Sequence, residues 1–125
     1  MKLAFLSVPA RDYDTSKAFY EDILGLTVIE EYDGAPHRFT DYQLGDSCLK
    51  VYEWLEPWHA GHFTSFMMST PDLDGLLEKV AAAGYEARSP EITGWGGRIA
   101  AVKDPFGNIL NLLDEHQPVT SHSQG

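Results

Sequence analysis

Cysteine is nearly absent from this 125-residue chain, since Cys48 stands alone. A single cysteine excludes an intrachain disulfide and a cysteine-cluster metal site, and we expect Cys48 to be a small buried residue of a strand rather than a nucleophile. Basic residues are also scarce: 9 of them accompany 19 acidic residues, for a formal net charge of −10. This charge argues against nucleic acid and anionic membranes as partners and gives mild support to a cationic ligand.

Long apolar runs are missing as well. No stretch approaches the roughly 20 apolar residues of a membrane span. The apolar run at residues 1–6 is too short for a signal peptide. We therefore expect a cytoplasmic protein with no membrane partner. What is present is a globular composition, 43% hydrophobic and 22% charged, in a chain long enough for one domain.

The two halves of the chain repeat one order of elements. The first half predicts a strand at 3–8 that Pro9 ends, followed by a helix that Gly25 closes. The N-terminus of this helix could be capped by Asp14, Thr15 or Ser16. Three further strands are predicted at 26–32, 38–44 and 48–55. The second half predicts a helix between Asp72 and Gly84, with strands at 63–69, 85–88, 98–103 and 109–113.

Three landmarks recur about sixty positions apart, which indicates a duplicated βαβββ unit: Asp12 with Asp72, Gly25 with Gly84, and Gly45 with Gly107. The predicted fold class is α+β, with one domain at 1–116. Module one covers about 1–57, a linker 58–61 and module two about 62–116, and a polar tail follows at 117–125. Two such modules can turn their free sheet faces toward each other and enclose a cup for a ligand.

Two stretches resemble the vicinal oxygen chelate superfamily: "DYDTSKAFYEDILGL" at 12–26 and "GWGGRIAAVKDPFGNILNLL" at 94–113. That group includes glyoxalase I, extradiol dioxygenases, fosfomycin-resistance enzymes and bleomycin-resistance proteins. The resemblance covers about residues 3–115 and implies a U-shaped, mostly antiparallel sheet and a homodimer. It does not fix the reaction, because the fold hosts several chemistries.

Enzymes of the superfamily place a divalent metal in the cup, held by a residue of the first and of the last strand in each module. The matching positions here are Phe5, Lys50, Ser65 and Asn111, none of which is a good metal ligand. We therefore predict no metal and no cofactor, and place the chain closest to the metal-free, bleomycin-resistance-like members. Binding of a metal through other positions, such as His59 or His62, remains open, although these two are expected in a solvated linker.

The predicted ligand-binding face follows from strand alternation around those four positions. It contains no histidine and no carboxylate, and its candidate ligand-binding residues are Phe5, Ser7, Lys50, Tyr52, Trp54, Ser65, Met67, Trp95 and Asn111. Two of these residues have two interpretations. Trp95 either closes over a ligand or packs at the module boundary, and Lys50 pairs either with an anionic ligand group or with a native carboxylate.

Two functions are consistent with this face. The first is metal-free binding of a small aromatic or cationic compound in a dimeric cup, as in bleomycin-resistance proteins. The alternative is an enzyme acting on a small metabolite, either a lyase or isomerase of the superfamily or a metal-dependent glyoxalase- or dioxygenase-like one. Catalytic residues are not assigned, because the face holds only Ser7, Ser65, Tyr52, Cys48 and Lys50 as polar reactive groups.

Overall fold

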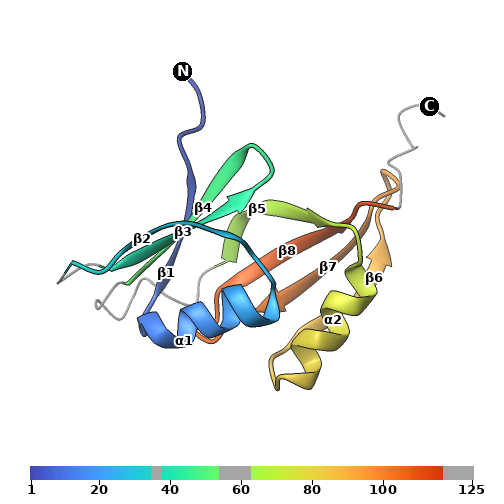
Figure 1. The fold of residues 1–125 in the computed structure, drawn as a ribbon. Helices are drawn as coiled ribbons and strands as arrows, with labels where there is room; N and C mark the ends of the chain where they lie inside the picture. Colours follow the sequence, from blue (N-terminus) through green and yellow to red (C-terminus); the bar gives the residue numbers. More distant parts are fainter. Residues whose placement is uncertain (35–37, 54–62, 117–125) are drawn as a thin grey trace. The chain divides into compact units, whose positions relative to one another are not determined.

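The computed structural model describes residues 1–34, 38–53 and 63–116. The chain forms two compact units, one of Met1–His62 with Asp104–Asn108 and one of Phe63–Lys103 with Ile109–Gly125. Each unit contains one four-stranded sheet and its helix (Figure 1), which confirms the predicted α+β fold with two tandem βαβββ modules. The predicted module and linker boundaries stay a prediction.

The sheet of the first unit has the order β1-β4-β3-β2, in which β1 runs parallel to β4 and the other pairs are antiparallel. Its elements, in chain order, are β1 (Leu6–Ala10), α1 (Tyr13–Lys17), the π-helix η1 (Ala18–Ile23), β2 (Val28–Tyr32), β3 (Phe39–Leu44) and β4 (Ser47–Glu53).

The sheet of the second unit repeats this plan with the order β5-β8-β7-β6, where β5 and β8 are the parallel pair. Its elements are β5 (Phe63–Thr70), α2 (Leu73–Ala82), β6 (Ala87–Ile92), β7 (Arg98–Lys103) and β8 (Ile109–Asp114).

The repeated aspartates, Asp12 and Asp72, are the N-caps of the two helices. Asp12 Oδ1 accepts a hydrogen bond from Thr15 N at 3.0 Å, and Asp72 Oδ1 accepts one from Gly75 N at 3.1 Å. The hydrogen bond from the Thr15 amide lowers the pKa of Asp12, because it favours the charged carboxylate. The cap expected within 14–16 is therefore wrong, whereas Asp72 is confirmed.

The helix of the first unit widens where the chain must bury two consecutive aromatic residues. After α1 it continues as η1, and Leu24 N bonds back to Phe19 O at 3.0 Å. Phe19 and Tyr20 are both fully buried, with their rings edge to face at 5.2 Å. The wider π turn directs both neighbours into the core.

Proline lies inside two edge strands. Pro9 is part of β1, which extends to Ala10, and Pro90 is part of β6, where the register shifts between Arg88 and Glu91. The expectation that Pro9 ends the first strand is wrong. Edge strands pair on one side only, so a residue without a backbone N–H is tolerated there.

In both sheets one face is buried and the other is partly open. The first unit buries Val8, Tyr42, Leu49 and Val51 with the helix side chains, while alternate residues of β3 and β4 are half-buried. The second unit buries an equivalent set together with α2, made of Leu73, Val80, Ala100, Val102, Leu110 and Leu112. Several of the side chains predicted to bind a ligand lie on these open faces, among them Lys50 and Asn111.

The Asp104–Asn108 turn between β7 and β8 packs into the core of the first unit. Asp104 is 4% exposed, and its carboxylate accepts hydrogen bonds from Tyr20 Oη (2.7 Å), Asn108 Nδ2 (2.8 Å) and two backbone amides. Asn108 Nδ2 also donates to Pro9 O at 2.8 Å. This part of the hairpin is therefore structural.

Candidate functional site

The open face of the first sheet carries a row of polar side chains across neighbouring strands. The register aligns Ser7 of β1 with Lys50 of β4, Lys50 with Asp41 of β3, and Asp41 with Glu30 of β2. The next row contains Tyr52, whose neighbours in the register are Pro9 and Phe39. Ser7, Lys50 and Tyr52 therefore share one face, as the alternation predicts.

Lys50 is the centre of this face. Its Nζ lies 3.0 Å from Asp41 Oδ1, 3.4 Å from the centroid of the Phe39 ring and 5.1 Å from that of Phe5. The Lys50 side chain is 20% exposed and that of Asp41 14%, so the ion pair is largely withdrawn from water. Within the described part of the chain no hydrogen bond of good geometry reaches Asp41 Oδ1, so the contact is an electrostatic one. Of the two interpretations of Lys50, the native carboxylate partner is present.

Asp41 corrects one expectation about this face. The face was expected to hold no carboxylate, yet Asp41 and, beside it in the register, Glu30 are on it. The expectation considered only the first and last strand of each module. The two middle strands contribute side chains to the same surface, because residues opposite each other in a sheet point the same way.

Burial changes the acidity of two groups on this face. It raises the pKa of the Cys48 thiol, and the negative charge of Asp41 raises it further, while Lys50 acts in the opposite direction. Burial likewise raises the pKa of the Tyr52 hydroxyl. Both groups are therefore neutral near neutral pH, which suits hydrogen bonding to a ligand better than nucleophilic attack.

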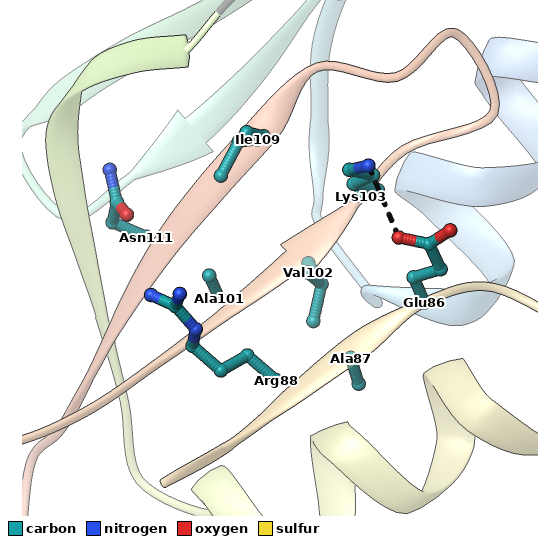
Figure 2. Close-up of a pocket in the computed structure, with 8 residues that line it drawn as sticks. All are labelled: Glu86, Ala87, Arg88, Ala101, Val102, Lys103, Ile109 and Asn111. Carbon is teal, nitrogen blue, oxygen red and sulfur yellow. Dashed lines mark ion pairs between the residues drawn. The ribbon is translucent and has the colours of Figure 1, made fainter. Parts of the chain in front are cut away.

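The second unit contains a pocket of about 600 Å³ on the open face of its sheet (Figure 2). This volume is within the range of small-molecule sites. Strands β6, β7 and β8 line it with Glu86, Ala87, Arg88, Ala101, Val102, Lys103, Ile109 and Asn111. Lys103 Nζ lies 3.2 Å from Glu86 Oε2, so one of the two cations is paired with the single carboxylate.

Asn111 connects this pocket with the predicted face. It is aligned with Met67 of β5 and with Ala101 of β7, and its Nδ2 donates to Phe66 O at 3.4 Å. Met67 is 42% exposed. Sequence reasoning missed Glu86, Arg88 and Lys103, although alternation along the two strands of the β6–β7 hairpin was a signal that could have found them.

Trp95 lies in the loop between β6 and β7 and packs on its own loop. Its ring occupies the place where a Cβ on Gly97 would stand, and the residue is 37% exposed. Thr93 organises the loop, because Gly97 N donates to Thr93 Oγ1 at 3.0 Å and Thr93 N donates to Gly97 O at 2.8 Å. Both interpretations of Trp95, closure over a ligand and packing at the module boundary, stay predictions.

Several predicted residues cannot be placed. Trp54, His59 and His62 lie outside the described residues, and the side chain of Ser65 does as well. Among residues 1–34, 38–53 and 66–116, no group of three or more histidine, cysteine, aspartate or glutamate side chains could hold a metal ion. Arg98, at the start of β7, pairs with Asp74 and Asp114.

None of the helices in the described part of the chain is long and apolar enough to cross a membrane.

Comparisons with known proteins give a consistent family. The family model described as Glyoxalase/Bleomycin resistance protein/Dioxygenase superfamily matches residues 2–112. A bleomycin resistance protein of Klebsiella pneumoniae is 29% identical over 86% of this chain and 87% of the relative, and a lactoylglutathione lyase of Haemophilus influenzae is 22% identical over 91% and 93%. The crystal structure of TnmS3, an antibiotic binding protein from Streptomyces sp. CB03234, matches with a TM-score of 0.76 and 25% identity over 91% of this chain and 95% of that one.

Proposed function

The chain belongs to the glyoxalase/bleomycin resistance protein/dioxygenase superfamily, and within it we propose a metal-free homodimer that binds a small organic ligand. The ligand is a compound with a planar aromatic body or a cationic group, held on the open face of a sheet. Similarity to a bleomycin resistance protein and to an antibiotic binding protein supports binding rather than catalysis.

The observation that carries the proposal is the environment of Lys50. An ammonium stands at one of the positions where metal-dependent relatives are expected to have a ligand, and Asp41 holds it at 3.0 Å. A cation fixed there repels a divalent metal. Phe5, a residue that is 45% exposed, and Phe39 add flat apolar surface beside the charge. Such a surface suits a planar ligand.

A thermal-shift screen of a few hundred metabolites and planar drugs tests the binding function. A ligand at 100 times its dissociation constant stabilises the protein by about 2.7 kcal/mol. We expect a saturable ligand whose affinity is unaffected by a chelator and reduced by Phe39→Ala. The exposed Val28→Ala, on the edge strand β2, is the control for a general loss of apolar surface.

Two results would contradict the proposal. The first is a stoichiometric divalent metal that remains after dialysis and is lost in Lys50→Met or Asn111→Ala. The second is turnover of the ligand in the same mixture, which would assign the protein to the enzymes of the superfamily.

A further inference from the structure

The charged side chains that line the pocket of the second unit are positive on balance, whereas the whole chain is negative. Its lining contains two cations, Arg88 and Lys103, and one carboxylate, Glu86, in a protein of formal net charge −10. The Lys103–Glu86 pair is exposed, with side-chain exposures of 47% and 76%, so it is weak and can exchange partners with a ligand.

Arg88 differs from the other pocket charges in having no ion pair or hydrogen bond with any residue in the described ranges 1–34, 38–53 and 63–116. By contrast, Arg38 pairs with Glu53 and Asp33, and Arg98 with Asp74 and Asp114. In so acidic a chain most described cations have found a carboxylate. An unpaired guanidinium in a pocket retains all its donors for a ligand.

The strand register places one polar and one apolar side chain beside the Arg88 guanidinium. Arg88 is aligned with Ala101, and Ala101 with Asn111, so the three side chains form one row across β6, β7 and β8. The small methyl group of Ala101 leaves the space between the two longer side chains hollow, and Figure 2 shows Arg88 extending over it toward Asn111. Ile109, from the neighbouring row, adds an apolar wall.

We infer that this row is a subsite for an anionic group, in which Arg88 binds a carboxylate or phosphate on an otherwise apolar ligand. A guanidinium matches the two oxygens of such a group with parallel hydrogen bonds, and the Asn111 amide adds a further polar contact. The inference rests on the proposed binding function and adds to it a ligand with an acidic group beside its planar body.

Three matched probes test the subsite by calorimetry: naphthoate, the neutral naphthamide and the cationic naphthylmethylammonium. Naphthoate is expected to bind at least about tenfold more tightly than naphthamide. Arg88→Gln is expected to remove that difference while leaving naphthamide binding unchanged, and Arg88→Lys to retain part of it. The control Lys79→Gln removes the same charge from an exposed site on α2, outside the pocket, and is expected to change nothing. Naphthoate is also expected to shift the Arg88 Nε–Hε resonance.

The inference and the proposed function fail in different ways. Equal binding of all three probes, or a naphthoate preference that persists in Arg88→Gln, overturns the anionic subsite and leaves the binding function intact. No binding of naphthoate at millimolar concentration also overturns the subsite. The binding function fails instead if the broader screen yields no saturable ligand, or by the metal and turnover results given above.

Discussion

Cys48 and Lys50 flank Leu49 on β4 and project from the same face, where Asp41 influences both of them. Because Cys48 is the single cysteine, its alkylation rate reports on this cluster directly. Burial and the Asp41 charge raise the pKa of the Cys48 thiol, so the folded protein is expected to react more slowly than the chain unfolded in urea.

Substitutions on either side of the ion pair are expected to move the alkylation rate in opposite directions. Asp41→Asn removes the negative charge and is expected to speed the reaction about threefold to tenfold, whereas Lys50→Gln is expected to slow it. Asp22→Asn, an exposed change on η1, serves as the charge control. Equal rates in all four proteins would show that Asp41 does not act on the thiol.

Asp104 is the residue whose loss is expected to cost most stability. In Asp104→Asn an amide group replaces one oxygen that accepts hydrogen bonds, which leaves buried donors unpaired at a cost of about 1–3 kcal/mol. Chemical denaturation measures this loss, and Asp46→Asn in the exposed β3–β4 turn is the matched control.

The pH dependence of the Asp104→Asn loss is a second check. Burial raises the pKa of Asp104, so its contribution to folding is full below the ordinary carboxyl pKa and declines as the pH rises through the raised value. The difference in unfolding free energy between the wild type and the variant is therefore expected to widen on acidification from neutrality. A constant difference would contradict the raised pKa.

At the scale of elements, the position of the Trp95 ring in the β6–β7 loop is expected to require glycine at residue 97, because glycine has no Cβ. A Cβ at that position would meet the Trp95 ring, so Gly97→Ala is expected to displace the ring and shift the Trp95 indole N–H resonance. The cost in stability is small, because a side-chain end moves rather than backbone. Gly94→Ala in the same loop meets nothing within 4 Å and is expected to leave the resonance in place.

Helices and strands were predictable from the sequence where local signals, such as alternation and capping, and the packing of the folded chain favour the same structure. The strand at 98–103 matches β7, and Asp72 caps α2, because alternation and capping act over a few residues. The π-helix was missed because its width is set by the burial of Phe19 and Tyr20. Strand ends near Pro9 and Pro90 were misjudged because edge position, which makes proline acceptable, is a property of the whole sheet.

The candidate site was less predictable than the elements. Ser7, Lys50 and Tyr52 share a face as alternation along single strands requires, but Asp41 comes from a strand whose register had to be known first. A cross-strand neighbour is fixed by pairing between distant segments, and a single sequence carries little information on that pairing.

At the scale of the whole molecule, the testable quantity is mass. Light scattering at micromolar concentration is expected to give twice the 13.9 kDa of one chain. The described residues of one chain leave several large apolar side chains uncovered, among them Phe5, Ile29 and Tyr32. A mass that stays at that of a single chain would refute the homodimer.

The Asp104–Asn108 turn also determines when the first unit can finish folding during synthesis on the ribosome. The first unit needs a segment that emerges long after residue 62, because Tyr20 Oη donates to Asp104 and Pro9 O accepts from Asn108. At about 5–20 residues per second, that segment arrives about 2–9 s later. Until residue 108 has emerged, the first unit therefore lacks these two hydrogen bonds, and its core is complete only once that turn packs into it.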